Sequence, residues 1–199
     1  GYGGVALPAT GARVFLGGGG GAGTGNNFTA PNSSGASGGG MVLIRAGAVA
    51  GAGTISANGA AAYNTTENDG GGGGGAGGTI VLTSPSASLT GATLVANGGR
   101  GGNAWATQAG AGNAHGPGGG GGGGIIITSS SPTATSVLAG QNGITTTGNL
   151  AYGADPGQPG ITATTTPASI PGASGGAQCA NLSITKTGPA TVNAGGSLT

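Results

Sequence analysis

The sequence predicts an all-β protein built from glycine-rich repeats, and three observations lead to this prediction. Glycine supplies 54 of the 199 residues, and charged residues make up only 4% of the chain. Short apolar runs recur along the chain, and each is preceded by a run of glycine. Disordered chains are normally rich in charge, so a nearly neutral chain with recurring apolar runs indicates an ordered architecture.

Internal repetition is the most informative feature of the chain. The run Ile80–Ser84 recurs 45 positions later as Ile125–Ser129, and an earlier copy, Val42–Arg45, lies about 38 positions before it. Each copy leads to an Asn-Gly pair: Asn58-Gly59, Asn97-Gly98 and Asn142-Gly143. A half-copy, Val14-Phe15-Leu16, opens the chain. Repetition at such a period is typical of stacked units, so we expect a solenoid-like domain over residues 1–160.

Each repeat is expected to hold two strands and two corners. The apolar runs do not alternate with polar residues, which favours strands buried on both faces. The Asn-Gly pairs predict one corner, because both residues tolerate positive φ. Ser84-Pro85-Ser86 and Ser131-Pro132-Thr133 predict the other corner.

The glycine runs, such as Gly70–Gly75 and Gly118–Gly124, need a different conformation. A glycine helix costs about 1 kcal/mol per residue relative to alanine, and a glycine strand has no side chains to pack. An extended polyglycine-II segment with three residues per turn remains. Its N–H and C=O groups would have to bond neighbouring segments. The alternative is a flexible linker.

Two inserts separate the repeats, at residues 60–69 and 99–117, and we expect exposed loops there. They hold most of the polar and unusual side chains of the domain. The candidate recognition residues in them are Tyr63, Asn64, Arg100, Trp105 and His115. Exposed aromatic residues are common anchors for partners. Alternatively, Trp105 caps the open end of the core.

The amino-acid composition changes at Ile161. Residues 161–176 are expected to form a Thr/Pro/Gly/Ser linker. In residues 177–199 the apolar and polar side chains alternate as they do in a sandwich strand. The candidate assembly strand in this region consists of Asn181, Leu182, Ser183, Ile184 and Thr185.

Two stretches of sequence resemble known families. Residues 182–199, which read LSITKTGPATVNAGGSLT, resemble the opening of the DUF11-type immunoglobulin-like repeat of bacterial surface proteins. This resemblance implies a sandwich strand without its own sheet, which is either a truncation or a strand that pairs with another chain. Residues 16–23 and 54–59 resemble glycine-rich repeats of Gram-negative surface proteins. The glycine runs alone are similar to those of T-even-like phage tail-fibre adhesins.

The residues for most kinds of chemistry are scarce. The only close carboxylates, Glu67 and Asp69, are expected in a solvated loop, and His115 has no metal-binding neighbour in the sequence. Cys179 is expected to be an inert thiol, since an internal disulfide needs a second cysteine. Four scattered cations do not form a nucleic-acid patch, and no apolar stretch approaches the roughly 20 residues of a membrane span. We expect no enzyme activity, cofactor or metal.

The sequence therefore predicts an extracellular structural protein that self-associates into a bacterial surface filament. Assembly would use backbone hydrogen bonds and the C-terminal strand. A receptor-binding or glycan-binding adhesin that uses the insert loops is the first alternative. The second is an ice-binding polyglycine-II protein, because Thr145-Thr146-Thr147 and the threonines of residues 162–166 offer rows of hydroxyl and methyl groups.

Overall fold

The computed structural model describes residues 1–6, 13–25, 33–64, 69–85, 88–104, 115–146 and 148–166. Over these residues the chain forms strands and no helix, so the predicted all-β class is confirmed for this part of the chain. The strands are β1 (Met41–Arg45), β2 (Gly53–Ser56), β3 (Thr79–Thr83), β4 (Leu89–Val95), β5 (Ile125–Thr128), β6 (Pro132–Ser136) and β7 (Ile161–Thr164). Among the described residues there is no helix that could cross a membrane.

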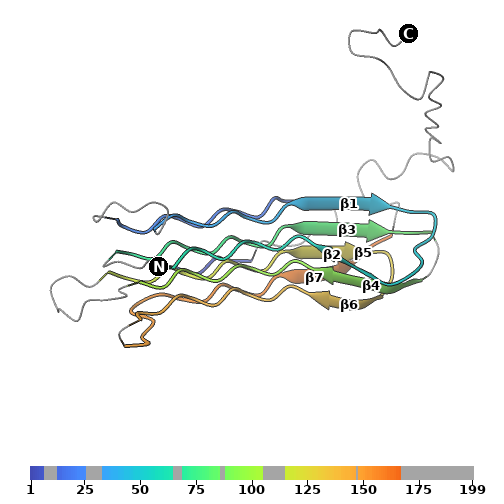
Figure 1. Cartoon of the computed structure of the whole chain (residues 1–199). Coiled ribbons are helices and arrows are strands. Elements are labelled where there is room, and N and C mark those ends of the chain that lie inside the picture. The colour runs from blue at the N-terminus through green and yellow to red at the C-terminus, as the bar shows by residue number, and fades with distance from the viewer. Residues whose placement is uncertain are drawn as a thin grey trace, which may run out of the picture.

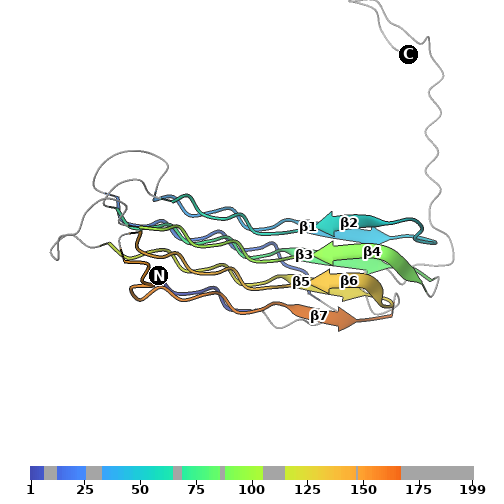
Figure 2. The same ribbon diagram turned by 60° about the horizontal axis from the view of Figure 1, so that its bottom comes forward.

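The strands form two parallel sheets at one end of the molecule. Sheet A has the order β1-β3-β5-β7, and sheet B has the order β2-β4-β6. In each unit the chain enters a strand of sheet A, turns, and returns through a strand of sheet B (Figure 1). Successive units therefore stack strand on strand, and the glycine-rich segments run away from the strands together (Figure 2).

The strand pairing tests the repeat alignment. Val42 pairs with Ile80, which is the predicted shift of 38 positions. Ile80 pairs with Ile126, a shift of 46 rather than the predicted 45. In sheet B, Val95 pairs with Ser136, a shift of 41. The two halves of a unit thus shift by different amounts, because the turn after β3 is longer than the turn after β5 and because the register of β4 against β6 shifts between Leu89 and Thr93.

The core lies between the two sheets. Ile80, Leu82, Leu94 and Ile126 are almost fully buried there. All residues of β3 and β5 are buried, as predicted for strands covered on both faces. The prediction is wrong for β1, in which half-buried and exposed residues alternate, because β1 is an edge strand with one uncovered face.

The second face of sheet A is covered in part by the N-terminal region. Phe15 packs against a small cluster that contains Val81 and Ile127. Its amide donates to the hydroxyl of Thr79 at 3.1 Å, and that hydroxyl donates to the carbonyl of Phe15 at 2.7 Å. The half-copy Val14-Phe15-Leu16 is therefore not a strand of either sheet. It supplies an aromatic cover to the centre of sheet A.

The glycine-rich segments form a bundle held by backbone hydrogen bonds. Within residues 70–78, amides three residues apart bond the same neighbour. Gly71, Gly74 and Gly77 donate to the carbonyls of residues 116, 119 and 122, at 3.0, 2.9 and 2.9 Å. The next amides along, Gly75 and Gly78, donate to a different segment, at the carbonyls of residues 60 and 57. The flexible-linker alternative is therefore wrong for this run.

Close packing in the bundle depends on the missing side chains. A Cβ atom on Gly74 would overlap the carbonyl oxygen of Gly99, and one on Gly121 would overlap that of Gly75. Because the obstacle in each case is backbone, no side-chain rotation relieves it. Gly21, by contrast, lies on the outside of the bundle, and a Cβ atom there would have no neighbour within 4 Å. The requirement for glycine therefore applies to interior positions.

Part of the predicted linker belongs to the fold. The sequence predicts a linker over residues 161–176, but Ile161–Thr164 form β7 and pair with β5 in register. The domain boundary predicted at residue 160 is therefore too early. The pairing holds because Ile161 lies beside Ile125 and Ala163 beside Ile127. The predicted assembly strand, Asn181–Thr185, lies outside the described residues.

The bundle leads to the first prediction. We expect Gly74→Ala to lower the free energy of unfolding by about 1–3 kcal/mol or more, because the methyl group must displace backbone. The matched variant Gly21→Ala should leave it unchanged or raise it by about 0.4–1 kcal/mol, since alanine restricts the unfolded chain. Urea-induced unfolding measures both values. Equal stabilities for the two variants would contradict backbone-to-backbone packing around Gly74.

Candidate functional site

The end of the bundle away from the sheets carries the connections between units. Hydrogen bonds join the segments at this end, including Gly23 N to Ser33 O at 2.7 Å, Gly71 N to Gly116 O at 3.0 Å and Thr146 N to Ala104 O at 3.1 Å. The inserts expected at residues 60–69 and 99–117 are therefore shorter than predicted, because residues 60–64, 99–104 and 115–117 extend the bundle. The glycine-rich segments end together at the end of the molecule opposite the strands (Figure 1).

The candidate recognition residues that the structure describes lie toward the end of the bundle away from the sheets, which we call the loop-bearing end. They differ in their contacts. Tyr63 is exposed and His115 is half-buried. Asn64 and Arg100 instead bond the bundle: the Asn64 side-chain oxygen accepts from the Asn103 amide at 3.0 Å. An Nη atom of Arg100 donates to the Asn103 side-chain oxygen at 2.8 Å. Both residues are also exposed, and their role in recognition stays a prediction. Trp105 lies outside the described residues.

Asparagine side chains link successive units where sheet B passes into the bundle. The side-chain oxygen of Asn58 accepts from the Asn97 amide at 2.7 Å. The side-chain oxygen of Asn97 accepts from the Leu138 amide at 2.8 Å and from the Ser136 hydroxyl at 2.8 Å. This forms an asparagine ladder from unit to unit, with Leu138 as its last member.

A second asparagine ladder lies nearer the loops. It runs from Asn64 to Asn103, and the Asn103 side-chain oxygen accepts from the Ile144 amide at 3.0 Å. Both ladders end at an apolar residue in the third unit, Leu138 in one and Ile144 in the other. The recurring asparagines are the only signal of these ladders in the sequence. Their hydrogen-bond partners could not be predicted, because each partner belongs to the next unit and is far away in the sequence.

These ladders correct the predicted Asn-Gly corners. The described residues with positive φ are Asn149, Tyr152, Gly51, Gly91 and Gly153, and none of them belongs to the three Asn-Gly pairs. The pairs lie within extended segments that continue from the strands. Asn142 is also not the counterpart of Asn97: its side-chain nitrogen donates to the carbonyl of Gly143, its own neighbour, at 2.7 Å.

Two further expectations about polar residues change. The sequence predicts Asp69 in a solvated loop, but this residue is only 3% exposed and lies at the start of the 70–78 segment. Thr145 is fully buried, while Thr162 and Thr164 line a groove. Thr162, Thr164 and Thr166 are exposed, so the ice-binding alternative stays a prediction for this row. Within the described ranges there is no group of three His, Cys, Asp or Glu residues that could hold a metal ion.

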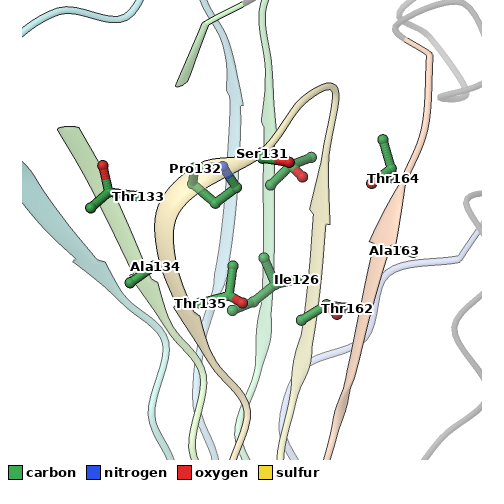
Figure 3. A pocket seen from close by; sticks show the side chains of 10 residues that line it. Ile126, Ser131, Pro132, Thr133, Ala134, Thr135, Thr162, Ala163 and Thr164 are labelled. Atoms are coloured by element: carbon green, nitrogen blue, oxygen red, sulfur yellow. The ribbon is translucent and has the colours of Figure 1, made fainter. Parts of the chain in front are cut away.

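A groove of about 320 Å³ opens between β6 and β7. Figure 3 shows Ile126 at its floor, with Thr133 and Thr135 of β6 on one side and Thr162 and Thr164 of β7 on the other. It exists because sheet A has four strands and sheet B has three, so no described strand of sheet B covers β7. Its walls carry mostly hydroxyl groups.

The opposite side of the stack ends in two edge strands, β1 and β2. The Ala46 amide donates to the Thr83 carbonyl at 3.0 Å, toward β3. Successive residues of a strand direct their N–H and C=O groups to alternate sides. Because the Ala46 amide points toward β3, the backbone groups of Met41, Leu43 and Arg45 point away from β3. Leu43 is 60% exposed. We call this side the β1 edge.

Next to the β1 edge, the space between the sheets is open. A hollow of about 340 Å³ is lined mainly by apolar residues, among them Ile44, Val49, Ile55 and Leu82. Backbone groups that point outward beside an apolar hollow are the features that an added strand uses in β-strand addition. The two sides of the stack thus differ, one apolar and the other rich in hydroxyl groups.

Comparison of the chain with protein-family models, with curated proteins and with solved structures finds no match.

The asparagine ladder leads to the second prediction. Asn97→Ala removes an acceptor for two hydrogen bonds, each of which contributes about 0.5–1.5 kcal/mol. We therefore expect the free energy of unfolding to fall by about 1–3 kcal/mol in urea titrations. Asn142→Ala is the control, because its bond is local, and we expect a change within about 0.5 kcal/mol. A loss at Asn142 as large as that at Asn97 would contradict the ladder's role.

Proposed function

We propose that the chain is an extracellular structural protein, a subunit of a bacterial surface filament. The single observation that supports this proposal most is the parallel stack, in which the described residues leave two different sides uncovered. When two different surfaces of identical subunits bind each other, each added subunit exposes a new binding surface. Such contacts produce fibres unless the rotation between subunits closes a ring. The apolar β1 edge is one such surface.

The proposed architecture is a short solenoid-like stack whose glycine-rich segments are polyglycine-II helices. The rotation of hydrogen-bond partners in residues 70–78 supports this, because a helix with three residues per turn directs every third amide at the same neighbour. A body of this kind contains few charges and satisfies its backbone groups internally. Both properties suit a protein that must resist proteolysis outside the cell.

Strand addition by the C-terminal segment would join the subunits. Leu182 and Ile184 alternate with polar residues, so an added strand would present both apolar side chains on one face. The apolar hollow at the β1 edge suits such a face. The open N–H and C=O groups of Leu43 and its neighbours would supply main-chain hydrogen bonds.

The assembly step leads to the third prediction. We expect the double variant Leu182→Asp/Ile184→Asp to lose filaments in electron micrographs, because two carboxylates would enter the apolar hollow. The matched variant Ser183→Asp/Thr185→Asp adds the same charge on the opposite face and should keep the filaments. Removal of residues 177–199 should also abolish them. Normal polymers after this removal would rule out joining by the C-terminal strand.

A receptor-binding adhesin is the second candidate function, and one observation favours it. The connections between units leave from one end of a rigid bundle, which is a common arrangement for recognition loops on a scaffold. The exposed Tyr63 lies beside one of these connections. On this proposal the partner is a surface receptor or a glycan.

The adhesin candidate leads to the fourth prediction. Replacement of residues 105–114 by a Gly-Ser sequence of equal length should abolish attachment to target cells. The thermal unfolding midpoint should stay unchanged, because the bundle residues on either side are kept. Attachment that survives the replacement would remove this loop from any recognition role.

A further inference from the structure

A groove with walls of glycine backbone runs along the bundle. It has a volume of about 240 Å³, and apart from Tyr2 and Ala76 every residue that lines it is glycine. We call it the glycine groove. Such walls offer a ligand backbone N–H and C=O groups and almost no side chains. Four segments of the bundle contribute to them, within residues 2–4, 18–21, 73–76 and 119–122.

Residues 70–78 leave one hydrogen-bonding direction unused, and it lies at the glycine groove. A segment with three residues per turn has three N–H and three C=O groups in each turn, and therefore six directions in which to bond neighbours. The third C=O direction belongs to Gly74, whose carbonyl accepts from no described residue and which lines the groove. The other five directions bond neighbouring segments, at residues 18–24, 36–39, 57–60, 99–102 and 116–122.

Residues 116–124 leave a complementary direction unused. Here the third N–H direction belongs to Gly119 and Gly122, whose amides donate to no described residue. Both residues line the glycine groove. The two central segments of the bundle thus face the same open position, one with acceptors and the other with donors. The other five directions of residues 116–124 bond segments at residues 1–4, 71–77, 96–102, 140–143 and 155–158.

The unused groups belong to the interior of the bundle. Gly74, Gly119 and Gly122 are buried, and buried backbone N–H and C=O groups in proteins nearly always have a partner. Another wall of the groove adds Gly18 and Gly21, whose amides also donate to no described residue. An occupant of the groove could therefore accept from two walls and donate to a third.

The spacing of these groups identifies the occupant. Gly119 and Gly122 are three residues apart, as are Gly18 and Gly21, which corresponds to about 9 Å at the rise of polyglycine II. A peptide backbone in the same conformation repeats its own N–H and C=O groups at this spacing. Its residues must be glycine where they meet the walls, because a Cβ atom on interior residues such as Gly74 overlaps backbone. We propose that the glycine groove binds an extended glycine-rich segment of another polypeptide.

Ala76 sets how far such a segment can enter. Gly73 and Ala76 take the same position in successive turns, line the groove and are half-buried, whereas the other residues of 70–78 are buried. The Ala76 methyl group therefore projects into the groove, where it would meet the backbone of an occupant. We expect the bound segment to run from the loop-bearing end to Ala76, a length of about six residues or about 19 Å.

Peptide binding to the full chain tests the proposal. The probe is an acetylated hexaglycine peptide with two C-terminal lysines for solubility, and the matched control is the hexaalanine peptide with the same lysines. We expect hexaglycine to shift the amide NMR signals of Gly119 and Gly122 in a saturable manner and to slow their hydrogen exchange. Hexaalanine should do neither, because its methyl groups keep the backbones apart.

A variant of the chain tests the location. Gly73→Ala places a methyl group in the groove one turn before Ala76 and should abolish hexaglycine binding. The bundle should tolerate it, since a Cβ atom at Gly73 has no neighbour closer than 3.3 Å. The matched variant is Gly40→Ala, whose Cβ atom has no neighbour within 4 Å and which does not line the groove. It should keep the binding, and equal thermal unfolding midpoints would show that both variants fold.

Ala76→Gly tests the predicted depth. Removal of this methyl group should strengthen the binding of a nonaglycine peptide, which is long enough to pass residue 76, and should leave the binding of hexaglycine unchanged. Equal effects on the two peptides would contradict the role of Ala76 as the end of the site.

Three results would overturn the inference. Equal binding of hexaglycine and hexaalanine would show that the groove does not select glycine. Failure of both to bind would show that solvent alone serves its backbone groups. Slow exchange of the Gly119 and Gly122 amides in a dilute chain without peptide would show that the chain fills the groove itself. Protection that appears only at high chain concentration would support the inference, with a second copy as the source of the segment.

The inference rests on the proposed polyglycine-II conformation of the bundle and not on filament assembly. A Gly73→Ala chain that loses hexaglycine binding and still forms filaments would support the glycine groove and show that assembly does not use it. A chain that binds hexaglycine as expected but forms no filaments would overturn the proposed function and leave this inference intact.

Discussion

The structure depends on one constraint: the backbone groups of the glycine runs must find partners in other segments. Glycine offers no side chain to bury, so the runs contribute to stability through N–H to C=O bonds alone. Those bonds require segments to approach so closely that a Cβ atom on Gly74 would overlap the carbonyl oxygen of Gly99. Glycine is therefore required for packing in the interior of the bundle. The strands of sheets A and B continue directly from these segments, so the bundle also fixes the distance between neighbouring strands.

Backbone hydrogen bonds alone do not fix the register of neighbouring glycine segments. A bundle without side chains could slide by three residues and form an equivalent set of hydrogen bonds. The apolar core between the sheets resists this, because Ile80 and Leu94 must stay buried together. The asparagine ladder adds a second lock, since the Asn97 side chain reaches the amide of Leu138 in the next unit. The hydrophobic core and the ladder thus fix the register, which the glycine segments do not determine by themselves.

The two ends and two sides of the molecule have different potential uses. The loop-bearing end presents the connections between units and suits recognition. The β1 edge presents outward-pointing backbone groups next to apolar side chains, and it is the surface proposed for assembly. The β6–β7 groove is lined mostly by residues with hydroxyl groups. The two proposed functions, a filament subunit and an adhesin, would therefore use separate surfaces of the same scaffold.

The strand content, the burial of β3 and β5, and the pairing of Val42 with Ile80 could all be predicted from the sequence, because apolar runs and local spacing carry that information. The partner of Asn97, the burial of Asp69 and Thr145, and the membership of Ile161–Thr164 in sheet A emerged only from the folded chain. Asn97 meets Leu138 because β4 and β6 pair with a shift of 41 positions at this end, whereas β3 and β5 of the same units pair with a shift of 46. The physical reason is common to these cases: contacts between units depend on turn and insert lengths, and a threonine-rich segment becomes a strand only when a neighbouring strand offers it an edge.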